Sequence, residues 1–529
     1  MVAALSVPIA PRRSFAWPAF GAFGWTAALL VAAAVVLRLP QMGNPVLHID
    51  DQFYLLVGRS FIEGELPYVD IWDRKPLGLF LIYGGIALLG GAGVIQYQLV
   101  ATAFAAATAI VVARIARRFA GPGCAAFAGI CYLASLGMLG GGGGQSPVFY
   151  NLFTAGAALL TLDAIRASDQ SAFLRRGFAA MLLAGLAIFV KQTAFPEGGF
   201  FGLCLLWSLW TRTRSPARVA GLGLAFAACG IAPTAAAFVA YAAMGHAGDY
   251  WFATFLSIFL KQPLGANRLL SGAMLILISL LPLVLVAAAG LRRLLRQAEP
   301  KQRSDALFLA GWLAAAVAGF LIVPNFFDHY SLHLFVPMSV AAAPMFDRER
   351  LGRLPGLIAI LWAMILSSYP DFPRTRVATA EFDRTAAIVE RHLRGGCLYV
   401  NEGPVHLYTA TGACRLTPYV FPDHLRSAAE STAIGIDAQA ELRRVLAARP
   451  TVIVTSDQVF LPDDPSARRI LHGALERSYR HVGTVATSLP GMWQDLQIWA
   501  LEGDPPNRQV RARQATPARR PLRDRGGLP

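Results

Sequence analysis

The chain alternates between long apolar runs and short polar segments over most of its 529 residues. Each apolar run is bounded by charged residues, Gly or Pro. A helix that spans a bilayer needs about 20 apolar residues, and most of these runs approach that length. We therefore predict a polytopic α-helical membrane protein with about eleven spans. The predicted spans cover residues 20–37, 94–113, 121–138, 148–165, 178–195, 198–211, 219–243, 270–291, 305–323, 330–346 and 355–369.

Composition agrees with a bilayer environment. Hydrophobic residues make up 55% of the chain and charged residues 15%, whereas soluble domains contain about 25% charged residues. A net charge of +15 would suggest nucleic-acid binding in a soluble protein. Here the basic residues lie in short clusters between apolar runs, a pattern typical of membrane topology. We therefore expect no nucleic-acid partner.

The distribution of Lys and Arg sets the predicted orientation. With a cytoplasmic N-terminus, and with the apolar segment 76–90 not crossing, the cytoplasmic segments hold 19 Lys and Arg, and the opposite-side loops before residue 370 hold seven. Cytoplasmic loops normally carry this excess. If 76–90 crossed, the bias would reverse. We therefore predict an external loop over 39–93 that includes surface helices, with 76–90 lying along the outer surface.

The sequence pattern changes after the last predicted span. Over 370–505, three helix-like segments each precede a strand-like segment, which predicts a small extracytoplasmic α/β domain. Cys397 and Cys414 each open a strand-like segment. A disulfide in an oxidising compartment and two unpaired buried thiols both remain open. Residues 506–529 are rich in Arg and Pro, which predicts a disordered basic tail.

The first external loop contains the candidate chemistry. Asp50 and Asp51 come at the start of a segment with apolar residues at helical spacing, which predicts an amphipathic surface helix. Adjacent carboxylates repel each other unless a cation, hydrogen-bond donors or a shared proton lies nearby. Arg59, Arg74 and Lys75 lie in the same loop. Two interpretations remain open: acid–base chemistry by the pair, or capping of the helix by Asp50.

This loop resembles the first external loop of the GT-C fold membrane glycosyltransferases. That superfamily includes the protein O-mannosyltransferases, the lipid A aminoarabinose transferases and the RgtA/B/C/D-like proteins. Its loop contains an acidic pair, a short amphipathic helix, a PY.D segment and a KPP motif. The matching segments here are Asp50-Asp51, DQFYLLVGRSFIEG, Pro67-Tyr68-Val69-Asp70 and Lys75-Pro76-Leu77. The chain departs from the family pattern where Asp51 replaces Glu and Leu77 replaces the second Pro.

The resemblance implies an inverting glycosyltransferase that uses a polyprenyl-phosphate sugar as donor. Asp50 matches the family's base. Asp51 matches its supporting acid, which would form an ion pair with an Arg. Lys75 matches the lysine directed at the donor phosphate. Arg74 and Arg59 are further candidate phosphate contacts. The expected acceptor is a lipid, an envelope glycan or a protein.

Other residues are candidate substrate contacts. Tyr68 and Asp70 belong to the PY.D segment, and His329 and Tyr330 resemble the family's HY run. Lys191 ends a predicted span, where a lysine that reaches toward the lipid headgroups is the competing interpretation. The resemblance also implies a catalytic GT-C-like domain over residues 1–369, in a multi-pass protein of the bacterial inner membrane. Its N-terminus would be cytoplasmic and its C-terminal domain periplasmic.

The sequence does not favour a metal. Asp328, His329 and His333 could join His48 and the acidic pair in an oxygen and imidazole site. However, the chain has no helix-spaced ligand motif such as HExxH, so we expect no metal and no other cofactor. Residues 140–144, all Gly, predict a flexible external loop without the lysine of a phosphate-binding loop.

Two other functional classes compete with the enzyme. A polytopic transporter or lipid flippase is the main alternative. It should place ionisable residues within its spans and show repeated halves, whereas nearly all charges here lie at span ends and the chain shows no internal repeat. The third class is a non-catalytic assembly protein that presents its outer domain.

Overall fold

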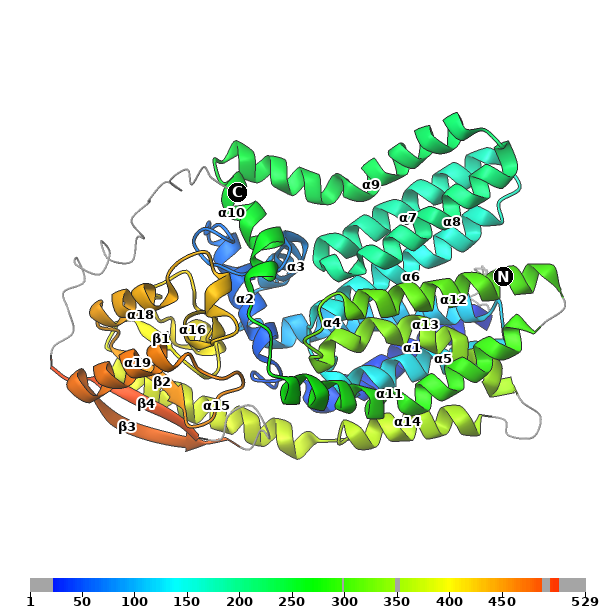
Figure 1. The fold of residues 1–529 in the computed structure, drawn as a ribbon. Coiled ribbons are helices and arrows are strands. Elements are labelled where there is room, and N and C mark those ends of the chain that lie inside the picture. The colour runs from blue at the N-terminus through cyan, green and yellow to red at the C-terminus, as the bar shows by residue number, and fades with distance from the viewer. Residues whose placement is uncertain (1–21, 297–298, 348–352, 488–494, 504–529) are drawn as a thin grey trace, which may run out of the picture.

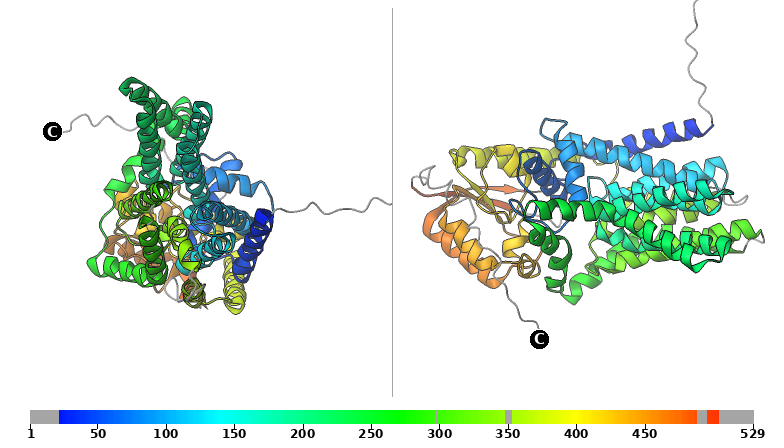
Figure 2. Two further views of the ribbon diagram at one scale, coloured as in Figure 1. Left: turned by 90° about the vertical axis from the view of Figure 1, so that its right-hand side faces the viewer. Right: turned by 90° about the horizontal axis from the view of Figure 1, so that it is seen from above.

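The computed structural model describes residues 22–296, 299–347, 353–487 and 495–503. Long helices form a membrane domain at one end of the molecule, and helices and a small sheet form an outer domain at the other end (Figures 1 and 2). The predicted tail from residue 506 onward lies outside the described residues.

The membrane domain is a bundle in which consecutive helices run back and forth (Figure 1). Its helices are α1 (Ala22–Arg38), α4 (Val94–Ala116), α5 (Pro122–Leu136), α6 (Ser146–Ile165), α7 (Gln170–Val190), α8 (Phe195–Thr213), α9 (Pro216–Ala243), α11 (Ala266–Leu295), α12 (Pro300–Leu321), α13 (Phe335–Ala342) and α14 (Leu354–Leu366).

Eight helices in the described part of the chain are long and apolar enough to cross a membrane, three fewer than predicted. The protein is therefore a multi-pass membrane protein, and the predicted count of eleven spans is not confirmed. Predicted span 198–211 is the 19-residue α8, which is not among the eight. Span 330–346 is divided between a 3-10 helix (Asp328–Leu334) and α13. Span 355–369 is mostly α14, whose 13 residues extend about 20 Å, less than a bilayer core of about 30 Å.

Two short helices fold the first outer loop against the bundle. They are α2 (Ile49–Ile62) and α3 (Leu77–Ala87), and they pack on each other. The 11 residues of α3 extend only about 16 Å, too short to cross. A Cβ added at Gly58 would lie 2.5 Å from the backbone carbon of Tyr83. Glycine therefore lets the two helices approach closely.

The outer domain follows α14 and begins with α15, which leads from the bundle toward the sheet (Figure 1). Four strands form one sheet in the order β1-β2-β4-β3, in which β1 and β2 are parallel and the other pairs antiparallel. The elements are α15 (Phe372–Leu393), β1 (Leu398–Val400), α16 (His406–Thr411), α17 (Asp423–Arg426), α18 (Ala438–Ala447), β2 (Val452–Ser456), α19 (Pro465–Ser478), β3 (Tyr479–Ala486) and β4 (Asp495–Leu501).

The predicted order of helices and strands matches β1, β2 and β3 and the helices that precede them. The strand β4 was not predicted, although it pairs with both β2 and β3 and its side chains alternate between buried and half-buried. Cys397 and Cys414 form a disulfide, which decides between the two alternatives left open by the sequence.

Candidate active site

A cavity of about 870 Å³ lies between the membrane domain and the outer domain. Its walls come from the first outer loop, from the segments that follow α7, α9 and α12, and from the outer domain. Segments far apart in the sequence therefore meet around one space, and this space contains most of the candidate residues.

One side of the cavity is apolar and opens outward. Trp251, Leu256, Phe259, Leu275 and Ile322 line it, yet each is between 45% and 83% exposed. Large exposed apolar side chains are costly in water but favourable against lipid. The cavity can therefore be entered from an apolar environment at the edge of the membrane domain.

Asp50 lies on the polar side, in the first turn of α2. The Nδ1 atom of His48 accepts the backbone N–H of Asp50 at 3.4 Å, so His48 is the helix cap. The interpretation of Asp50 as the cap is therefore wrong. The Oδ2 atom of Asp50 lies 3.3 Å from the amide nitrogen of Gln145, 3.7 Å from Nε2 of His329 and 3.9 Å from Nδ1 of His48.

Asp50 and Lys75 influence each other's ionisation. Burial opposes ionisation of Asp50, but the charges of Lys75 and the two histidines outweigh it and hold the pKa well below its ordinary range. Burial also opposes the charge on Lys75, but Asp50 and Asp73 outweigh it and raise the Lys75 pKa. The cavity therefore holds an ionised carboxylate beside a persistent ammonium.

Asp51 has a different environment from Asp50. It is fully buried, and its Oδ2 atom accepts the backbone N–H of Gly144 at 2.8 Å. Burial raises the pKa of Asp51 to about 7. Among the described residues it makes no ion pair, because the nearby Arg38 instead donates to the carbonyls of Gly141 and Gly143, each at 2.6 Å. Asp51 therefore supports the loop beside Asp50 and does not line the cavity.

The glycine run 140–144 is a packed loop, so the predicted flexible loop is wrong. The hydroxyl of Tyr83 donates to the Gly144 carbonyl at 2.8 Å. A Cβ at Gly143 would lie 1.9 Å from Oδ2 of Asp51. Only glycine leaves room for these side chains. The loop ends at Gln145, whose amide reaches Asp50, and the repeated glycine was the signal in the sequence for this close approach.

The predicted phosphate contacts divide into two groups. Lys75 and Arg74 line the cavity, and Arg59 does not. Arg59 follows Asp50 by nine residues on the same helix, about 13 Å along its axis, and donates to the carbonyl of Gly91. The structure therefore does not bring Arg59 to the cavity together with Lys75 and Arg74.

Arg74 is held by the outer domain. It pairs with Glu430, which also pairs with Lys261 at 2.5 Å. Burial opposes ionisation of Glu430, but the two cations outweigh it and lower its pKa to about 2. The Nε and Nη2 atoms of Arg74 are buried without a hydrogen-bond partner. This three-residue ion cluster joins the first outer loop, the segment after α9 and the outer domain at the cavity.

Comparison with known proteins identifies the architecture. No protein-family model and no curated protein sequence matches the chain. The structure of ArnT from Cupriavidus metallidurans in the apo state matches with a TM-score of 0.60 and 17% identity, over 90% of this chain and 98% of that one. The same protein bound to undecaprenyl phosphate matches with a TM-score of 0.61 and 15% identity, over 91% and 99%. ArnT is a GT-C fold glycosyltransferase. This chain has the GT-C fold.

Two predicted substrate contacts of this GT-C chain lie outside the cavity. Tyr68 is buried, and its hydroxyl donates to the backbone carbonyl of Lys75 at 2.8 Å. Asp70 is exposed, and its Oδ2 atom accepts the backbone N–H of Leu66 at 2.8 Å. Both residues shape the segment that leads to Lys75.

The other three predicted contacts line the cavity of the GT-C chain: Lys191, His329 and Tyr330. The ammonium of Lys191 lies 4.7 Å from the centre of the Tyr330 ring, so it faces the cavity rather than the lipid headgroups. Burial, aided by the charge of Lys75, lowers the pKa of Lys191 to about 7.

The outer domain contributes acidic residues that the sequence did not indicate. Glu402, Asp423 and Glu430 line the cavity, and Arg426 pairs with the first two. They are more than 350 residues from Asp50 in the sequence, and no local pattern marks them. Their contribution follows from how the outer domain sits on the GT-C bundle.

Proposed function

We propose that the chain is an inverting glycosyltransferase that moves a sugar from a polyprenyl-phosphate donor to an extracytoplasmic acceptor. One observation carries this proposal: a single cavity combines the ionised Asp50, the cations Lys75 and Lys191, and an apolar side open toward lipid. A polyprenyl-phosphate sugar has three matching parts, namely a lipid chain, a phosphate and a reactive sugar carbon.

In the proposed reaction, the Asp50 carboxylate takes the proton of an acceptor hydroxyl. The hydroxyl oxygen then attacks the anomeric carbon of the donor sugar. The bond between that carbon and the phosphate oxygen breaks, and its electron pair leaves on polyprenyl phosphate. Lys75 stabilises the negative charge that develops on this leaving group. A single displacement from the opposite face inverts the anomeric carbon.

The comparisons support the general kind of reaction. ArnT in the matching structure is bound to undecaprenyl phosphate, which is a polyprenyl phosphate. We extend this to a donor of that class here, with a lipid, an envelope glycan or a protein as acceptor. The bias of Lys and Arg favours a cavity outside the cytoplasm, where nucleotide sugars are absent and a lipid-linked donor would be required.

A transfer assay with an Asp50→Asn variant tests the proposal. Purified chain in lipid nanodiscs would be given polyprenyl-phosphate hexoses and pentoses together with envelope lipid and glycan acceptors. Release of polyprenyl phosphate and the anomeric configuration of the product would be measured. We expect inversion by the wild type and a loss of about 100- to 10,000-fold in Asp50→Asn, because proton transfer by a positioned base contributes about 10² to 10⁴.

Glu63→Gln is the matched control, since Glu63 is exposed at the other end of α2. It should transfer sugar at the wild-type rate. Undiminished transfer by Asp50→Asn would remove the assignment of the base. The absence of transfer from every polyprenyl-linked sugar by the wild type would remove the proposed function.

A further inference from the structure

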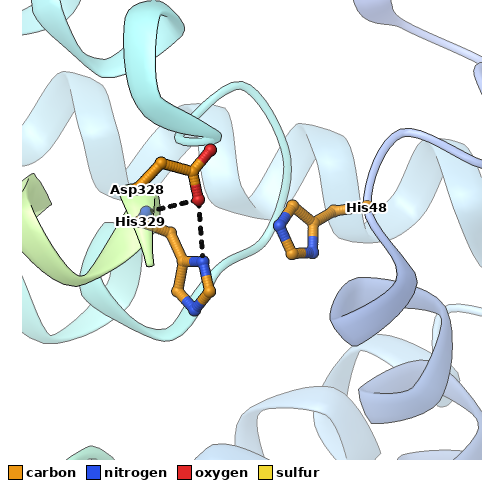
Figure 3. A group of neighbouring side chains, drawn as sticks. All are labelled: His48, Asp328 and His329. Carbon is orange, nitrogen blue, oxygen red and sulfur yellow. Dashed lines mark hydrogen bonds and ion pairs between the residues drawn. The ribbon is translucent and has the colours of Figure 1, made fainter. Parts of the chain in front are cut away.

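Two imidazoles and a carboxylate meet at the polar side of the cavity (Figure 3). His48, Asp328 and His329 each offer a ligand atom, and these atoms all lie within 4.8 Å of one another. His48 precedes α2, while the other two residues begin the 3-10 helix before α13. His333, a fourth candidate from the sequence, lies apart because its Nε2 atom bonds the carbonyl of Ala316.

We propose that these three residues bind a divalent cation of the Zn²⁺ class. The Oδ1 atom of Asp328 lies 3.2 Å from Nδ1 of His329. Two ligands of a tetrahedral zinc ion with bonds of about 2.0–2.1 Å lie about 3.3 Å apart. The pair therefore already has the spacing of two ligands of one ion, and the His48 ring faces it (Figure 3).

Neighbouring side chains lie close to the ring nitrogens of His48 and His329 that would not bind the metal. A bound histidine usually donates its other ring N–H to a carboxylate or carbonyl. The Nε2 atom of His329 lies 3.7 Å from Oδ2 of Asp50. The Nδ1 atom of His48 lies 2.5 Å from the side-chain amide of Gln145. Gln145 is fully buried, and its Oε1 atom has no hydrogen-bond partner.

Rotation of the Gln145 amide would resolve this partnerless oxygen. It places Oε1 where it accepts an N–H from Nδ1 of His48, which leaves Nε2 of His48 as a lone pair for a cation. The change gives up the 3.4 Å cap bond from the Asp50 backbone and the 3.3 Å contact of the Gln145 amide nitrogen with Oδ2 of Asp50. A buried acceptor is thus satisfied in the tautomer that binds metal.

The ligand types select the ion. Two imidazoles and one carboxylate suit zinc and similar transition metals, whereas Mg²⁺ and Ca²⁺ prefer oxygen ligands. All three residues line the cavity, so a remaining coordination position would face the substrate, as in catalytic zinc sites. An acceptor hydroxyl bound there would lie near Asp50 and lose its proton more easily. Only this role rests on the proposed function.

Metal binding is measurable without donor or acceptor. Full-length chain with a histidine-free affinity tag would be placed in nanodiscs, stripped with a chelator and titrated with Zn²⁺ against a chromophoric competitor. We expect one Zn²⁺ per chain, at least tenfold weaker binding in His48→Ala and in His329→Ala, and no displacement by millimolar Mg²⁺. His392→Ala should bind as the wild type does, because His392 lies on α15 and bonds the carbonyl of Ile388.

Equal Zn²⁺ affinity in the wild type and in the double variant His48→Ala/His329→Ala would overturn the proposal. Sugar transfer by a chain that binds no Zn²⁺ would overturn the metal site and leave the glycosyltransferase intact. Zn²⁺ binding at these residues without any sugar transfer would support the site and count against the proposed function alone.

Discussion

The two walls of the cavity differ in whether their charged side chains form ion pairs. The membrane-domain wall contains Lys75 and Lys191, and neither lysine lies in an ion pair within the described part of the chain. Their ammonium groups lie instead over the rings of Tyr54 and Tyr330, at 5.3 and 4.7 Å from the ring centres. This wall therefore keeps positive charge available for a ligand.

The outer-domain wall contains Glu402, Asp423 and Glu430, and each of these acids has a cationic partner. Arg426 pairs with Glu402 and Asp423, and Arg74 pairs with Glu430. A paired carboxylate offers less to a ligand than a free one, because binding must first replace the existing partner. The comparison indicates that the membrane-domain wall binds the anionic donor and the outer-domain wall sets the geometry around it.

The strongest test of this difference is Lys75→Met. It removes an uncommitted cation from the membrane-domain wall. A hydrogen bond to a charged group contributes about 1.5–3 kcal/mol, so we expect the Kd for a polyprenyl phosphate to rise by roughly 10- to 150-fold. Titration of the lipid into nanodiscs that contain the chain measures this. Arg59→Met is the matched control, because Arg59 is a cation of the same loop outside the cavity, and its Kd should not change. Equal losses in both variants would contradict the assignment of Lys75.

Gly143→Ala tests whether the membrane-domain wall must be rigid. The new Cβ would lie 1.9 Å from Oδ2 of Asp51, so the glycine loop must shift and move Gln145 away from Asp50. Overpacking of this kind costs about 1–3 kcal/mol. We expect sugar transfer to fall about tenfold and thermal stability to fall with it. Gly85→Ala is the control, because a Cβ there meets nothing within 4 Å. Wild-type transfer by Gly143→Ala would show that the loop does not position the base.

The same contrast explains what the sequence could predict. The membrane-domain wall comes mainly from one short segment, so the acidic pair, Lys75 and the surface helices were found from local patterns. The failures within that segment are geometric. Arg59 is near Asp50 in the sequence but about 13 Å away along the helix, and Asp51 points into the protein.

The outer-domain wall had no comparable signal. Glu430 contacts Arg74 across 356 residues of sequence. His329 and Asp50 are also far apart in the sequence, so only the folded chain brings each pair together. The fold itself was mostly predictable, because apolar runs and their flanking charges follow from the bilayer. Spans such as α14 were harder to predict, because an apolar run shows composition and does not fix where the helix ends.

A smaller effect is expected from the pH dependence of Lys191. Its pKa of about 7 means that the ammonium is charged below this pH and mostly neutral above it. A sugar phosphodiester keeps one negative charge across this range. Donor affinity should therefore fall as pH rises from 6 to 8, by up to about tenfold. Lys191→Arg should show no such slope, because its guanidinium stays charged. The same slope in Lys191→Arg would assign the titration to another group.

The smallest expected effect comes from Glu430→Gln, which changes the outer-domain wall. The variant keeps the shape of the side chain and removes the negative charge that holds Arg74 and Lys261. A donor phosphate would then meet less competition for these cations, so its Kd should fall by about two- to threefold. Glu441→Gln removes an equivalent ion pair with Arg444 at 2.6 Å, and because Glu441 does not line the cavity, the donor Kd should stay unchanged. If Glu430→Gln instead weakens donor binding, Glu430 holds the two cations in the position that the phosphate needs. The outer-domain wall would then take part in donor binding as directly as the membrane-domain wall does.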